Sequence, residues 1–145
     1  MKVPRLTQAL IVLLLMAAVV SGCSSMGKKP PGIASVTVTD KVDEKSMAPQ
    51  NSVSRFSKDV NRLFVAVLVT NPQKGTVAEV QWYFQKPGET DWQAFDKAKV
   101  TFDAKTRDRY AAFSLEAAAG FSPGSYKAEI LLNGKSERAV SFAIE

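Results

Sequence analysis

The amino-acid sequence predicts an all-β protein whose folded part is one antiparallel sandwich of about seven strands. Residues 76–85 and 126–132 alternate apolar and polar side chains, which is the two-residue period of a β-strand. No helical period of comparable length follows residue 33. Asn133-Gly134, the dipeptide most typical of a two-residue hairpin turn, comes directly after the second alternating segment. Short strands separated by such turns favour two packed sheets.

The chain of 145 residues is predicted to begin with a cleaved signal peptide, residues 1–22. Lys2 and Arg5 give this segment a positive start, and residues 9–20 are apolar without interruption. The apolar run is shorter than the about 20 residues that a membrane span needs. Its position after the positive charges is that of an export signal.

The end of the leader, Val20-Ser21-Gly22-Cys23, resembles the lipobox of bacterial lipoproteins. The resemblance implies that the leader is cut between Gly22 and Cys23, that the Cys23 thiol carries a diacylglycerol, and that the new amino group is often acylated as well. Two or three acyl chains make membrane attachment long-lived. In diderm lipoproteins an Asp after the lipidated Cys is associated with retention at the inner membrane. Ser24 therefore implies transport to the outer membrane, with the protein on its periplasmic face.

Residues 23–32 are rich in Ser, Gly and Pro, which predicts a flexible tether between the lipid and a single domain of residues 33–145. Cys23 is the one cysteine of the chain, so no intramolecular disulfide can form. The domain must therefore rely on its hydrophobic core for stability.

The first half of the domain is predicted to contain three strands and one long loop. Residues 34–39 alternate as a strand does, and the polar residues 41–58 form the loop. Residues 62–70 form a strand that is apolar on both faces, although an antiparallel strand usually exposes one face to water. We therefore expect the loop, another part of the chain or a partner to cover its second face. Residues 76–85 form the third strand, with Val80, Trp82 and Phe84 facing inward.

The second half is predicted to contain the remaining strands. Residues 92–102 are less regular and favour one or two short strands, and residues 109–115 form the next strand. Two further strands lie on either side of the hairpin turn at Asn133-Gly134. The inward-facing residues of these last three strands are Ala111, Phe113 and Leu115, then Tyr126, Ala128, Ile130 and Leu132, then Val140, Phe142 and Ile144.

The segment Phe121-Ser122-Pro123-Gly124-Ser125-Tyr126 resembles the turn before strand F of immunoglobulin-like and fibronectin type III domains. In those domains the tyrosine forms a corner in which its hydroxyl bonds to the backbone. Val80-x-Trp82 resembles their strand C with its buried tryptophan. The chain lacks the cysteine pair of antibody domains, which excludes that branch. It is also similar to small envelope lipoproteins that end in an F-x-P-G-x-Y … N-G … F pattern.

Composition argues against several function classes. The sequence has no histidine, which excludes Ser-His-Asp and Cys-His catalytic sites and the usual zinc sites. Its carboxylates show neither a converging pair nor a calcium loop. The net charge is +5, but the Lys and Arg residues are scattered among Asp and Glu. They form no basic stripe with aromatic residues between them, so we expect no nucleic-acid partner. We predict a protein that is not an enzyme and has neither cofactor nor metal.

The sequence thus favours a lipid-anchored, non-catalytic module that binds another component of the cell envelope. A protein is the favoured partner. The candidate partner face is the outward side of the strands around the hairpin, where the apolar residues are Tyr83, Leu131, Ala139 and Ala143. The alternative is a periplasmic protein that binds a small molecule or glycan through the loop aromatics Trp92, Phe95 and Phe121.

Overall fold

The computed structural model describes residues 29–145. The predicted signal peptide, the cleavage bond Gly22–Cys23, the lipidation site and Ser24 lie outside these residues. All regular structure within them is β. No helix of the described part is long and apolar enough to cross a membrane. The strands are β1 (Gly32–Thr39), β2 (Arg55–Phe56), β3 (Arg62–Thr70), β4 (Val77–Gln85), β5 (Gln93–Thr101), β6 (Arg109–Glu116), β7 (Gly124–Leu132) and β8 (Lys135–Ile144).

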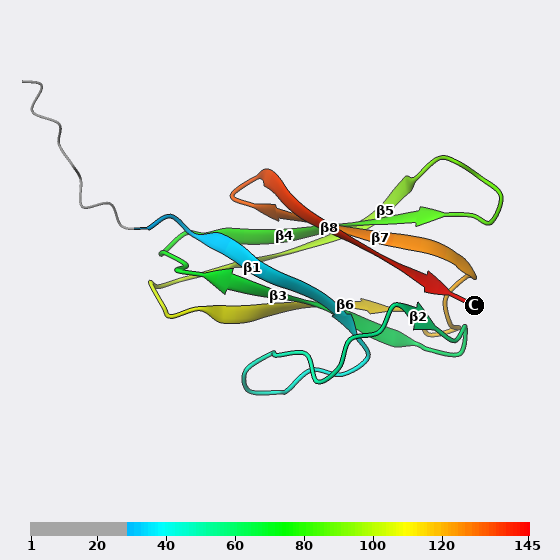
Figure 1. Ribbon diagram of the computed structural model, residues 1–145, viewed down its shortest axis with the longest axis horizontal. Coiled ribbons are helices and arrows are strands. Elements are labelled where there is room, and N and C mark those ends of the chain that lie inside the picture. Colours follow the sequence, from blue (N-terminus) through cyan, green and yellow to red (C-terminus); the bar gives the residue numbers. More distant parts are fainter. Residues whose placement is uncertain (1–28) are drawn as a thin grey trace, which may run out of the picture.

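These strands form two sheets that pack face to face (Figure 1). One sheet has three strands in the order β1-β3-β6, and the other has five in the order β2-β8-β7-β4-β5. The short β2 pairs parallel with β8, and every other described pair is antiparallel. The predicted all-β antiparallel sandwich is confirmed.

Most of the predicted inward residues form the core, and Phe84 and Val140 are partly buried against it. Val80, Trp82 and Ile130 have no exposed surface, and Tyr126 is 4% exposed. The predicted strand 62–70 is β3 with the same bounds. The first strand begins at Gly32, which pairs with Thr70, so the residue expected at the end of the tether already belongs to the sheet.

The loop between β1 and β3 closes one edge of the sandwich. The Val53 N–H donates to the Val38 carbonyl at 2.9 Å, along the free edge of β1. Phe56 then enters the core next to β8, and the ring centroids of Phe56 and Phe142 are 5.7 Å apart. The loop therefore joins the β1 edge of one sheet to the β8 edge of the other.

The second face of β3 is shielded by its neighbours in the sheet. Ala66 is fully buried between β1 and β6, while Phe64 and Leu68 are half-buried. The Arg62 guanidinium carbon lies 4.7 Å from the centre of the Phe64 ring. Side chains of β1, β3 and β6 thus partly cover the second apolar face of β3, for which a cover was expected.

The hairpin turn between β7 and β8 has the predicted conformation. Asn133 has φ 50° and Gly134 has φ 82°, the two positive values that a type I′ turn requires. The Asn133 side-chain oxygen also accepts the Val77 N–H at 2.9 Å, which ties the turn to β4.

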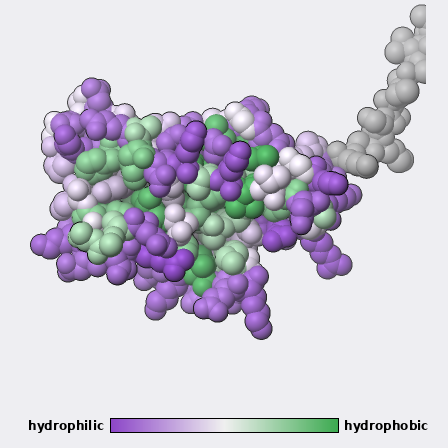
Figure 2. Space-filling model, turned by 180° about the vertical axis from the view of Figure 1, so that it is seen from behind, coloured by the Kyte–Doolittle hydropathy of each residue, from purple (hydrophilic) through white to green (hydrophobic). Residues whose placement is uncertain are grey.

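The opposite edge of the sandwich is open because five strands face three. β1 lies against β8 and β6 is the last strand of its sheet, so β5 extends beyond the opposing layer. All nine residues of β5 are exposed. Phe95 is 47% exposed and Val100 is 36% exposed. Figure 2 shows the molecule from the side opposite to that of Figure 1, and apolar side chains come to the surface across its middle.

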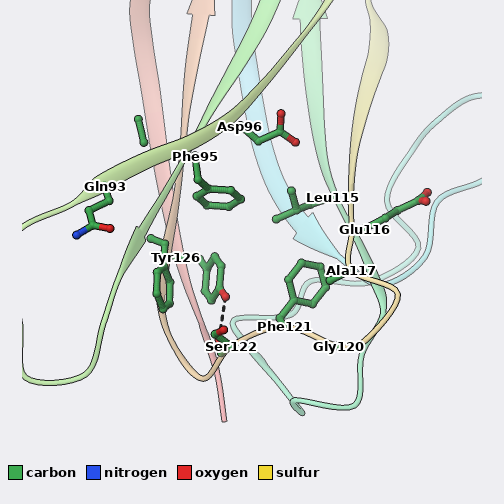
Figure 3. A pocket seen from close by; sticks show the side chains of 12 residues that line it. Gln93, Phe95, Asp96, Leu115, Glu116, Ala117, Gly120, Phe121, Ser122 and Tyr126 are labelled. Carbon is green, nitrogen blue, oxygen red and sulfur yellow. Dashed lines mark hydrogen bonds between the residues drawn. The ribbon is translucent and has the colours of Figure 1, made fainter.

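The irregularity expected at residues 92–102 arises from a β-bulge within one continuous strand. Asp96 lies opposite Trp82, whereas Ala94 lies opposite Tyr83, so Phe95 is the additional residue. The bulge turns Phe95 toward the gap between the two sheets (Figure 3).

Candidate functional site

The four residues of the candidate partner face lie on the outer face of the five-stranded sheet, since β4, β7 and β8 are neighbours. Tyr83, Leu131 and Ala143 are half-buried and Ala139 is exposed. The register places polar residues among them: Lys127 is opposite Tyr83, and Glu129 is opposite Ala139. The four residues therefore share a face without forming a continuous apolar patch.

Polar contacts organise the centre of this outer face. The Tyr83 hydroxyl donates to Glu129 Oε2 at 2.9 Å, and the Ser136 hydroxyl donates to Glu129 Oε1 at 2.6 Å. The bonds from Ser136 and from Tyr83 hold the pKa of Glu129 below its usual value. The same carboxylate raises the pKa of Tyr83, because it accepts the proton that the phenol would lose.

Trp92 belongs to this outer face and not to the open edge. The Lys127 ammonium nitrogen lies 4.8 Å from the centre of the Trp92 ring and 4.5 Å from that of Tyr83. A lysine between two aromatic rings is a cation–π arrangement that fixes all three side chains.

Phe95 and Phe121, the other two aromatics of the predicted ligand site, line a single cavity at the open edge (Figure 3). Its volume is about 420 Å³, and it lies between the ends of β5 and β6. Phe84, Leu115 and Tyr126 complete the apolar part of the wall. The structure therefore brings together two of the three predicted aromatics and separates Trp92 from them.

Tyr126 forms the floor of this cavity. Its hydroxyl donates to the Ser122 carbonyl at 2.8 Å, which is the tyrosine corner that the sequence resemblance implied. The centroid of its ring lies 4.9 Å from that of Phe84 and 6.1 Å from those of Phe95 and Phe121. Burial raises the pKa of the Tyr126 phenol. Tyr126 is thus a structural residue that also shapes the cavity.

Two carboxylates stand at the cavity wall. Glu116, at the end of β6, is paired with Arg62 at 3.0 Å between Oε1 and Nε. Asp96, on β5, accepts the backbone N–H of Lys97 at 2.8 Å. The cavity consequently combines an aromatic floor with a hydrogen-bond acceptor at its mouth. Residues 29–145 contain no group of three or more His, Cys, Asp or Glu that could hold a metal ion.

The exposed edge strand β5 is a further candidate site that was not predicted from the sequence. Lys97 and Lys99 alternate with Ala98 and Val100, a short pattern in which basic residues occupy one side of a strand and small apolar residues the other. Lysine is typical of edge strands, so this pattern could have indicated that residues 97–100 lie at the edge of a sheet.

Comparison with solved structures identifies the architecture. An immunoglobulin-like protein from Pseudomonas aeruginosa aligns with a TM-score of 0.52 over 82% of this chain and 99% of its own, at 14% sequence identity. The fold is immunoglobulin-like. At this level of identity the likeness concerns the fold alone.

Parts of larger proteins also align, with TM-scores below 0.5 that carry no information on activity. An alkylpurine DNA glycosylase from Pseudomonas fluorescens aligns over 83% of this chain and 31% of its own, with a TM-score of 0.46 and 15% identity. A β-D-glucoside glucohydrolase from Trichoderma reesei aligns over 80% of this chain and 19% of its own, with a TM-score of 0.45 and 13% identity. No protein family and no curated protein matches the chain in sequence.

Proposed function

We propose that this protein is a lipid-anchored, non-catalytic interaction module of the bacterial cell envelope, and that its partner is a protein. The anchor rests on the V-S-G-C segment and on the leader that precedes it. The immunoglobulin-like fold is compatible with an interaction module, because sandwich domains bind partners through sheet faces and edge strands. Fold alone does not fix function, so the proposal depends on the surface.

The open edge of the sandwich is the observation that carries the proposal. β5 is a nine-residue edge strand with every residue exposed. Its two large apolar side chains are uncovered: Phe95 lines the cavity, and Val100 lies further along the strand. Exposed apolar surface of this kind favours an interaction site. On the outer face, by contrast, the polar groups of Tyr83, Glu129 and Lys127 already bind one another. We therefore assign the partner site to the open edge, with the outer face as the comparison surface.

Position-specific photo-crosslinking in native membranes tests this function. A photoreactive residue replaces Phe95 on the open edge, Tyr83 on the outer face or Met47 in the loop of residues 41–54 of the full chain. We expect one envelope protein to be crosslinked from position 95, and not from position 47. Absence of any protein crosslink from all three positions would contradict the interaction module.

The binding of a small molecule or glycan is the second candidate, and the cavity shared by Phe95 and Phe121 favours it. Aromatic walls with one acceptor at the mouth suit an apolar or sugar ring. Glycan arrays probed with the full chain separate the two candidates: saturable glycan binding that Phe121→Ala abolishes, without a protein crosslink, would support this alternative.

We also propose that the lipid places the protein on the periplasmic face of the outer membrane, as Ser24 implies. Separation of inner and outer membranes by density, followed by detection of the chain in each, tests the location.

A further inference from the structure

We infer that β5 accepts an extended segment of the partner protein as an added strand, and that the side chains of this segment alternate between acidic and apolar. The inference rests on the proposed function and specifies the chemistry of the partner. It follows from the backbone of β5, from its two rows of side chains, and from the poor fit of a second copy of this chain.

The backbone of β5 is paired on one side only. The Phe102 N–H donates to the Thr76 carbonyl at 2.8 Å, while Val77 exchanges hydrogen bonds with Asn133 on the β7 side. Residues of an antiparallel pair face their partner strand alternately. The N–H and C=O groups of Lys97, Lys99 and Thr101 therefore point away from β4, toward the open edge. The Lys97 N–H already donates to the Asp96 carboxylate at 2.8 Å. An added strand would find the N–H groups of Lys99 and Thr101 as donors and the three carbonyl oxygens as acceptors.

Beyond Asp96, the core-facing row of β5 is apolar and uncovered. Ala98 lies opposite Val80 and Val100 opposite Ala78, and both β4 residues are fully buried. Val100 nevertheless remains 36% exposed, because the opposing sheet ends at β6. Apolar side chains on an added strand would cover this row. A larger one would enter the cavity beside Phe95, where the Asp96 carboxylate can accept a hydrogen bond from its tip (Figure 3).

The solvent-facing row of β5 is basic. Lys97 lies opposite Gln81 and Lys99 opposite Glu79. Neither lysine takes part in an ion pair closer than 4 Å within residues 29–145. Opposite charges directly across a strand pair stabilise it, and like charges destabilise it. The matching positions of the partner strand are therefore acidic.

A second copy of this chain fits the centre of the same edge poorly. Antiparallel pairing of two β5 strands centred on residue 97, 98 or 99 places Lys97 opposite Lys97, Lys97 opposite Lys99, or Lys99 opposite Lys99. Each arrangement sets two positive charges against each other. The lysines thus disfavour self-pairing at the centre of the edge and select a partner of opposite charge.

A random dodecapeptide library displayed on phage tests the inference, with the full chain in lipid nanodiscs as the target and empty nanodiscs as the control. We expect the enriched peptides to alternate Asp or Glu with apolar residues. Synthetic copies should bind wild-type protein and bind Lys97→Glu/Lys99→Glu at least tenfold more weakly. Peptides in which Lys replaces the acidic residues should show the reverse preference.

Lys99→Thr and Lys99→Pro form a matched pair that tests the backbone contact. Both remove the charge, but only proline removes the N–H that faces the open edge. We expect the threonine variant to bind the peptide a few-fold more weakly than wild type. The proline variant should bind it at least tenfold more weakly than the threonine variant. Tyr83→Glu/Leu131→Lys on the outer face should leave peptide affinity unchanged. Retention of the wild-type tryptophan fluorescence identifies variants that remain folded.

Four results would overturn the inference: no enrichment, enrichment without alternation, binding that is equal for wild type and Lys97→Glu/Lys99→Glu, and a dimer of the chain alone that Lys97→Glu abolishes. None of them excludes the interaction module itself. If one of these four results is obtained, a protein crosslinked from position 95 or from position 83 would still support the interaction module, and only strand addition at β5 would be rejected.

Discussion

The Tyr126 hydroxyl donates a hydrogen bond of 2.8 Å to the carbonyl of Ser122, four residues earlier in the chain. This bond closes the turn that leads into β7 and fixes the Tyr126 ring between the rings of Phe84 and Phe142. Since Phe121 and Phe95 pack against the same ring, the corner also determines the shape of the cavity at the open edge.

Tyr126→Phe is expected to lower the free energy of unfolding by about 1 kcal/mol, because it removes one hydrogen bond and keeps the ring. Unfolding in urea, followed by tryptophan fluorescence, measures this change. Tyr83→Phe is the control on the outer face and should change stability by about 0.5 kcal/mol or less. Equal stability of Tyr126→Phe and wild type would mean that the corner bond contributes nothing.

Trp82 is fully buried, and its indole nitrogen has no hydrogen-bond partner among the described residues. Trp82→Ala should cost about 3–5 kcal/mol through the cavity that it leaves. Trp82→Phe should cost clearly less, because it fills part of the space and removes a buried donor that is unpaired. Denaturant unfolding monitored by circular dichroism compares the two. An equal cost for both variants would argue against this explanation.

Gly124 and Gly134 both have positive φ, but only Gly124 lies against other atoms. A Cβ at position 124 would be 2.6 Å from Phe84 Cε2 and 2.8 Å from the Gln85 carbonyl oxygen, whereas a Cβ at position 134 meets nothing within 4 Å. Gly134→Ala should cost about 1 kcal/mol from backbone strain. Gly124→Ala should cost more, because β4 must also move. Thermal melts of the two variants give the ranking, and the reverse order would contradict it.

The Tyr83–Glu129 bond predicts a specific titration. The carboxylate raises the pKa of Tyr83 above its ordinary value of 10.0, so the ring should ionise at higher pH than a free tyrosine. Glu129→Gln should lower the Tyr83 pKa toward that value, since the charged acceptor is gone. NMR titration of the Tyr83 ring follows the change, and Ser136→Ala provides a milder comparison because it leaves the carboxylate in place. An identical Tyr83 titration in wild type and Glu129→Gln would refute the assigned bond.

The local features of the fold could be read from the sequence because each depends on near neighbours in the chain. The alternation around Trp82 fixed the inward face of β4, and Asn133-Gly134 fixed the hairpin. The corner at Tyr126 followed from the resemblance of its turn to those of immunoglobulin-like domains.

The open edge could not be predicted in the same way. Ala98 and Val100 face the core side, yet they are exposed, because the opposing sheet stops at β6. The number of strands in the opposing sheet is a tertiary property that no local pattern encodes. The meeting of Phe95 and Phe121 in one cavity, with Trp92 on the outer face, likewise depends on the bulge in β5 and on the packing of the two sheets.

The lipid anchor is tested most directly by the mass of the N-terminal peptide of the protein purified from membranes. A mature chain that begins at Cys23 and carries the added mass of a diacylglycerol is the expected result, together with an unprocessed precursor for Cys23→Ala. An N-terminus at another residue, an unmodified Cys23 thiol, or normal processing of Cys23→Ala would contradict the membrane-anchored module.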